Sequence, residues 1–213
     1  MDLSIASHKA NAREGSATVN YLGDAVKQFQ RRLSRLNAGL ERLLQTMEQH
    51  SERELSRSPV PGAWTPLQTL HHLYLAERAS LDYLLYKRRE QTDVPRSNIA
   101  ARLRGQLVRA SLLSPLKFKA PATTDSQRVE SAKDLTVETL AYDFRELRRQ
   151  LGVFFHDLPT GWARGAVYKH PVAGRLTLRD MLGFFIVHQR RHAQQITRAL
   201  AQNARDHSRQ KAR

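Results

Sequence analysis

Residues 177–200 read TLRDMLGFFIVHQRRHAQQITRAL, and their pattern is the clearest indication of the fold class. The apolar residues of this stretch recur at helical spacing, so an α-helix with 3.6 residues per turn gathers them on one face. Thr177 and Asp180 approximate a capping box, which marks the beginning of a helix. The stretch therefore predicts one long helix whose core-facing stripe holds Leu178, Met181, Phe185, Ile196 and Ala199.

Two other segments carry a comparable apolar stripe. In residues 22–47 the apolar positions alternate steps of four and three, which is typical of a helix in a bundle. Residues 136–158 repeat the pattern, with Thr136 as the predicted N-cap and Pro159 as the residue that ends the helix. Both segments are predicted to be long helices with one face in the core.

A further helix is predicted to begin after Thr65, because Thr65 suits an N-cap and Pro66 the first helical position. It continues to about Glu90 and is apolar on nearly every side, as expected of a central helix. Four long helices in this order predict an all-α four-helix bundle. Residues 92–133 would form a long crossover between helices two and three, and residues 160–176 a small irregular flap.

Length and composition indicate a single globular domain. The chain has 213 residues, with 35 Lys and Arg against 20 Asp and Glu, for a formal charge of +15. We expect a flexible N-terminal lead-in over residues 1–18, the bundle over 19–202 and a basic flexible tail over 203–213. Cysteine is absent, which excludes disulfides, thiolate metal sites and a cysteine nucleophile. No apolar run is long enough to span a membrane and no signal sequence is apparent, so a cytoplasmic protein is expected.

Two segments carry most of the positive charge. Residues 78–119 hold ten basic and three acidic side chains, and the residues from Arg198 onward are also basic. Such segments can bind the phosphates of nucleic acid, although a solvated basic surface is the more ordinary interpretation. Aromatic residues are not interleaved with the arginines of residues 96–109, which disfavours a stacking platform for single strands.

Two histidines, His188 and His192, fall on the apolar stripe of the last helix. Imidazoles four residues apart on one helical face can reach a single metal ion, as the two histidines of HExxH do. The glutamate of that motif is absent here, because Gln189 follows His188, and a general base of the zincin type is excluded. The alternative is a pair of core histidines bound to backbone or side-chain partners.

A third metal ligand would come from a facing helix, where His71 and His72 are the candidates. Periodicity does not choose between them, because that helix is apolar all round. Three neutral imidazoles leave at least one coordination position open for water or substrate, which is the pattern of a catalytic site.

The segment from Gly62 to Glu77, GAWTPLQTLHHLYLAE, resembles the opening motif of the DinB-like superfamily. The segment HPVAGRLT from His170, followed by HQRRHAQQI from His188, resembles the closing motif of that family. The resemblance spans roughly residues 20–202. It implies a DinB/YfiT-like four-helix bundle with a divalent metal ion, zinc, nickel or iron-like, at the open end of the bundle.

The resemblance places the three metal ligands on His72, His188 and His192, and so selects His72 over His71. Three further residues could assist them. Glu77 would accept a hydrogen bond from an imidazole, or would form an ordinary ion pair. His170 would line the mouth of the site or pack against Trp162. Gln195 would orient a ligand or be a helix-surface amide.

The resemblance also implies a metal-dependent enzyme that activates a thiol or a water molecule, of the thiol S-transferase or hydrolase type. Its partners would be a small-molecule substrate and a low-molecular-weight thiol cofactor. The alternative is a non-catalytic stress-response or binding module whose basic surface contacts nucleic acid or a protein partner. A homodimer is compatible with either function, and no membrane association is expected.

Overall fold

The structure of the chain is a computed structural model. It describes residues 3–90, 94–98, 135–159, 161–171 and 173–211, with residues 100, 103–107, 110 and 129 of the crossover; for 3–20 and 207–211 only the backbone is described. Its helices are α1 (Leu3–Glu48), the short α2 (Glu52–Leu55), α3 (Pro66–Arg89), α6 (Val137–His156) and α7 (Leu178–Lys211), and its strands are β1 (Tyr168–His170) and β2 (Gly174–Leu176).

The long helices begin where the sequence predicts. Thr65 caps α3 and Thr136 caps α6, each by accepting a hydrogen bond from the backbone N–H three residues on. Thr177 does the same for α7, since its Oγ1 accepts from the N–H of Asp180 and donates to the Asp180 carboxylate. These caps satisfy backbone donors that a helix leaves unpaired at its first turn.

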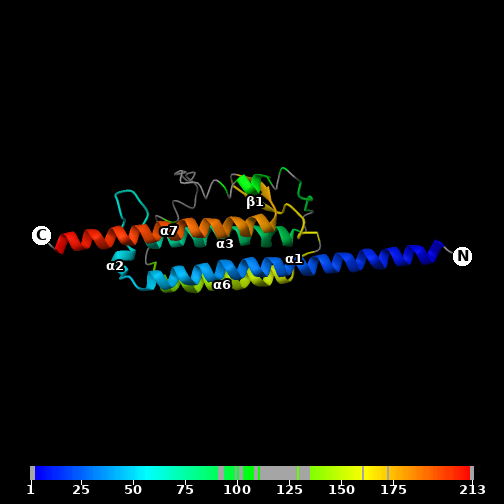
Figure 1. Cartoon of the computed structure of the whole chain (residues 1–213), viewed down its shortest axis with the longest axis horizontal. Helices are drawn as coiled ribbons and strands as arrows, with labels where there is room; N and C mark the ends of the chain where they lie inside the picture. The colour runs from blue at the N-terminus through cyan, green and yellow to red at the C-terminus, as the bar shows by residue number, and fades with distance from the viewer. Residues whose placement is uncertain are drawn as a thin grey trace.

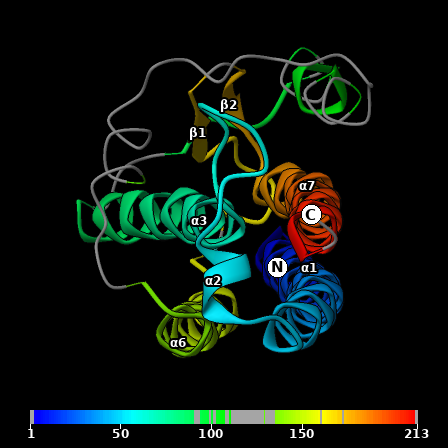
Figure 2. The same cartoon turned by 90° about the vertical axis from the view of Figure 1, so that its left-hand side faces the viewer.

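The four long helices form the predicted bundle, so the all-α fold is confirmed (Figure 1). Helices α1 and α7 run in one direction, and α3 and α6 run in the opposite one (Figure 1). Each helix packs against two others: α1 against α6 and α7, and α3 against the same two (Figure 2). The centre of the bundle is packed with buried aromatic and aliphatic side chains. Its largest fully buried side chains include Phe144, Phe154, Phe155, Phe185, Leu36, Leu40, Leu44, Met47, Leu70, Leu73, Leu81 and Leu84.

The loop before α7 corrects one prediction. Instead of an irregular flap, it contains an antiparallel hairpin in which Tyr168 pairs with Leu176 and His170 with Gly174. Gly174 has φ +71°, a conformation that suits glycine at this turn. The hairpin lies over α3 and α7 (Figure 2). The hairpin was not predicted from the sequence because strands of three residues are too short to show an alternation of apolar and polar side chains.

The beginning of the crossover is tied to the same loop. Backbone hydrogen bonds join Ser97 to Arg164 and Ala166 to Pro95. The predicted turn-rich piece, residues 114–121, and most of the basic segment 78–119 beyond Glu90 lie outside the described residues.

Helices α1 and α7 both extend beyond the predicted limits of the domain at residues 19 and 202. The division into lead-in, domain and tail stays a prediction. Within the described part of the chain, no helix is both long and apolar enough to cross a membrane.

Candidate metal centre

Three imidazoles from two facing helices meet between α3 and α7. The Nε2 atom of His188 lies 3.3 Å from Nε2 of His72 and 3.1 Å from Nε2 of His192. One nitrogen from each ring lies within 4.8 Å of the other two. His188 is buried, whereas His72 and His192 are partly accessible to solvent. The helices thus bring together the three histidines that the resemblance implies.

Two of these imidazoles are neutral at ordinary pH. Burial lowers the pKa of His188 well below its usual value, and the neighbouring imidazoles of His192 and His72 lower it further. Burial lowers the pKa of His192 to about 4, with His72 acting in the same direction. A neutral imidazole keeps a lone pair on one nitrogen, which is the form that binds a metal ion.

Gln195 fixes the orientation of one of these rings. Its Oε1 lies 3.0 Å from Nδ1 of His192, on the same helix three residues on. Because an amide oxygen only accepts, Nδ1 of His192 carries the proton and Nε2 carries the lone pair. A metal-ligating histidine commonly donates its second ring N–H in this way.

Aromatic rings cover two of the imidazoles. The ring of Trp64 lies 5.0 Å from that of His72, and the ring of Phe184 stacks on His188 at 5.0 Å and 16°. Such rings exclude water from the faces of the imidazoles and restrict their rotation. The sequence does not single out Phe184, because an aromatic residue on a core helix has no distinguishing signal.

The cluster fits a divalent first-row metal ion. Three imidazole nitrogens are a donor set that zinc, nickel and iron accept. Zn–N bonds of 2.0–2.1 Å in a tetrahedral site would separate the nitrogens by about 3.3 Å. The two Nε2 separations at His188, 3.1 and 3.3 Å, agree with that value. Nδ1 of His188 is buried without a hydrogen-bond partner among the described residues, so the polar contacts of this ring are those that its Nε2 makes with the other two imidazoles.

His71 and His170 lie outside the group of three converging histidines. His71 turns its ring toward Tyr74, at a centroid distance of 6.4 Å. His170 lies at the end of β1, where its Nδ1 accepts a hydrogen bond from the N–H of Ala173. Its ring meets Phe184 edge-on at 4.6 Å, and Phe184 in turn stacks on His188. His170 therefore supports the aromatic wall of the site.

Glu77 forms an ion pair, and not a hydrogen bond to one of the three imidazoles. Its Oε1 accepts a hydrogen bond of 2.8 Å from Arg148 on α6, and both side chains are buried. The same guanidinium reaches Gln189 on α7 and Asn37 on α1, each at 3.4 Å, so the pair joins all four long helices.

The sequence contains a signal for this buried network. Arg148 follows Phe144 by four residues and Gln189 follows Phe185 by four, so both occupy positions on apolar stripes. A charged or amide side chain at a core position needs a partner. Periodicity shows that need but not which helix supplies the partner.

The chain matches the model of the DinB superfamily over residues 35–196, and it belongs to that superfamily. Among solved structures it is similar to YfiT from Bacillus subtilis, described as "a probable metal-dependent hydrolase with an unusual four-helix bundle topology". The TM-score is 0.52 at 20% identity, covering 81% of this chain and 86% of that one, which is a likeness of fold. A search of curated proteins gives no match.

Proposed function

We propose that this chain is a metal-dependent hydrolase whose divalent cation is held by His72, His188 and His192. The observation that carries the proposal is the convergence of three imidazole nitrogens from α3 and α7, two of them 3.1 Å and 3.3 Å from Nε2 of His188. When bound, a cation at this point supplies Lewis acidity that lowers the pKa of a water molecule or a thiol toward neutrality.

The protein's own contribution is orientation and exclusion of water. Gln195 accepts the Nδ1 proton of His192 and so directs the Nε2 lone pair into the cluster. Phe184 and Trp64 cover two of the rings, and burial keeps His188 neutral. Substrate would approach from the side on which His72 and His192 remain partly accessible.

Hydrolysis is the reaction type supported by the description of YfiT as a probable metal-dependent hydrolase. Thiol S-transfer, which the resemblance to the family also implies, would need the same three imidazoles. The chain has no cysteine, so any thiol would come from a second small molecule. A nucleic-acid or protein partner at the basic surface, and a homodimer, stay predictions.

Elemental analysis of the protein after exposure to zinc, nickel and iron(II) tests the metal site. We expect about one equivalent of metal, lost in His72→Ala and in His188→Ala. His71→Ala is the matched control, since His71 is adjacent to His72 but outside the cluster. Equal metal content in all four proteins would refute the site.

The reaction type is tested on the metal-loaded protein with two panels. One contains esters and amides, and the other contains low-molecular-weight thiols with electrophiles. Turnover of an ester or amide that His188→Ala abolishes and His71→Ala retains supports the hydrolase. Metal-dependent consumption of a thiol without hydrolysis would replace it with the transferase.

A further inference from the structure

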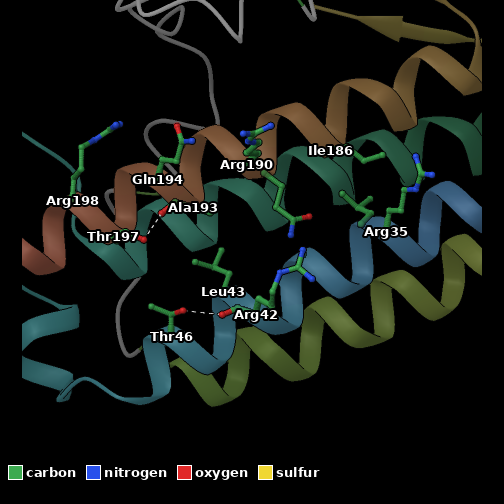
Figure 3. A pocket seen from close by; sticks show the side chains of 13 residues that line it. Arg35, Arg42, Leu43, Thr46, Ile186, Arg190, Ala193, Gln194, Thr197 and Arg198 are labelled. Carbon is green, nitrogen blue, oxygen red and sulfur yellow. Dashed lines mark hydrogen bonds between the residues drawn. The ribbon is translucent and has the colours of Figure 1, made fainter.

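A groove with a basic rim runs between α1 and α7 (Figure 3), and none of the three histidines lines it. Its volume is about 700 Å³, within the range of small-molecule sites. Four arginines line it and no acidic residue does: Arg35 and Arg42 from α1, Arg190 and Arg198 from α7. We refer to it as the α1/α7 groove.

No carboxylate among the residues that the structure describes neutralises the four guanidinium groups. They lie on exposed residues, and among the described residues none makes an ion pair or a side-chain hydrogen bond. Arginines elsewhere in the bundle are paired where carboxylates are near, as Arg145 is with Glu41. Four like charges around one groove repel one another, and an anionic ligand would relieve that repulsion.

The floor adds an apolar surface and one buried amide. Leu36 and Leu43 are buried beneath the groove, with Ile186 and Ala193 partly accessible on α7. The Gln189 side chain crosses the floor, where its Oε1 accepts from Arg148. Its amide nitrogen makes no hydrogen bond to any described residue, so it is a donor available at the middle of the groove.

Gly39 gives Gln189 the room to lie there. A Cβ at residue 39 would come within 2.9 Å of the Gln189 amide nitrogen, so a larger residue would push the side chain away. Arg35 and Arg42 lie on one side of the groove about 10 Å apart along α1, and Arg190 and Arg198 lie about 12 Å apart along α7.

We propose that the α1/α7 groove binds an elongated small anion that carries several linked phosphate groups. One phosphate would not reach arginines two helical turns apart, whereas a chain of phosphates would contact both walls and the Gln189 amide. Guanidinium groups suit phosphates because they donate paired hydrogen bonds. A second copy of the chain is disfavoured as occupant, since each copy carries a formal charge of +15.

Single-stranded nucleic acid is also disfavoured, because the residues lining the groove include no aromatic side chain on which bases would stack. The groove is separate from the metal site, but Gln189 directly follows His188. Binding at the groove is measured without reference to activity, so its failure would leave the proposed hydrolase untouched.

Calorimetric titration of the metal-loaded protein with inorganic tripolyphosphate, at about 150 mM salt, tests the proposal. Orthophosphate is the comparison ligand. The groove variant combines Arg42→Gln with Arg190→Gln, one arginine from each wall. The control variant combines Arg88→Gln with Arg89→Gln, which removes the same charge from the last turn of α3.

We expect tripolyphosphate to bind about tenfold or more tightly than orthophosphate, and its affinity to fall about tenfold in the groove variant and less than about twofold in the control. Equal losses in both variants would mean general charge attraction and would overturn the proposal. A signal unchanged in the groove variant would mean chelation of the metal by the probe, and it would overturn the proposal as well.

Two other occupants would be recognised with the same variants. If tripolyphosphate does not bind but a DNA oligonucleotide does, and only the groove variant loses it, the ligand is nucleic acid and the small-anion proposal is wrong. If the groove variant changes the molar mass measured by sedimentation and the probe fails to bind, the groove is an interface between copies. That result also overturns the proposal.

Discussion

Glu77 on α3 and Arg148 on α6 form an ion pair of 2.8 Å inside the bundle, with side chains only 1% and 4% exposed. A second atom of each group is buried without a hydrogen-bond partner among the described residues, namely Oε2 of Glu77 and Nε of Arg148. The pair therefore carries a desolvation cost that one hydrogen bond does not fully offset. Replacing one partner of the pair should therefore destabilise the protein more than replacing both partners.

The substitution Arg148→Met should lower the free energy of unfolding by about 3 kcal/mol or more, because it leaves the buried Glu77 carboxyl group without the partner that offsets its desolvation. Adding Glu77→Gln to Arg148→Met should recover part of that loss. Chemical denaturation measures both. Arg145→Met is the matched control, since it breaks the exposed pair with Glu41 and should cost less than about 1 kcal/mol. Similar losses for Arg145→Met and Arg148→Met would contradict the argument from burial.

The same glutamate should make stability depend on pH. Burial raises the pKa of Glu77 from 4.5 to about 7, although Arg148 opposes the shift. Because the folded pKa is the higher one, the folded state holds this proton more tightly. The resulting stabilisation is complete below pH 4.5 and is lost as the pH rises toward 7.

Glu77→Gln should remove that slope. Unfolding free energies of both proteins, measured without metal at several pH values between about 4.5 and 7.5, give the difference that belongs to Glu77. The buried histidines His188 and His192 make the unfolding free energy rise with pH between about pH 4 and 6.5. Their contribution is the same in both proteins, so it cancels in the difference. A difference that does not change with pH would show that Glu77 keeps an ordinary pKa.

The helices of this bundle were predictable because their signals are local. Thr65, Thr136 and Thr177 cap helices within three residues of themselves, and one apolar stripe recurs within each predicted segment. The signal for His188 and His192 was also local, because they lie four residues apart on one face of α7. Periodicity did not distinguish His72 from His71, and the prediction of His72 as the third ligand came from the resemblance to the family motif.

Contacts between helices were not predictable from the sequence. Glu77 and Arg148 are 71 residues apart in the chain, and the α1/α7 groove joins residues of α1 to residues of α7 that are at least 140 positions away. Such pairings depend on which helices become neighbours and on their register, which a helical period does not specify. The short hairpin before α7 was not predicted for a different reason. Its strands have three residues each, too few to show an alternation of apolar and polar side chains.

Gln195→Leu should weaken metal binding about 10- to 100-fold without unfolding the bundle. The substitution removes the acceptor for the Nδ1 proton of His192, so that ring is no longer held with its Nε2 lone pair toward His188. Competition with a chelating dye measures the affinity. Gln194→Leu is the control, as its side chain is exposed and lines the other face of α7. Equal affinities for both variants would show that Gln195 is an ordinary surface amide.

The substitutions Gly152→Ala and Gly165→Ala should change the stability of the protein in opposite directions. Gly152 lies inside α6, where an added Cβ would meet only Leu33, at 3.7 Å, an ordinary contact. Gly152→Ala should therefore stabilise the protein by about 0.5–1 kcal/mol, since glycine is a poor residue in a helix interior. Gly165 instead pairs with Arg96 at the start of the crossover, and an added Cβ would overlap the side chain of Val94.

Gly165→Ala should accordingly destabilise the protein, because Val94 or the paired backbone must move. Thermal unfolding of Gly152→Ala, Gly165→Ala and the wild type shows whether each substitution raises or lowers the stability. Hydrogen exchange at the N–H groups of Ser97 and Ala166, which bond to Arg164 and Pro95 across this junction, should quicken in Gly165→Ala alone. Unchanged exchange there would mean that the crossover is not held to the loop by this close approach.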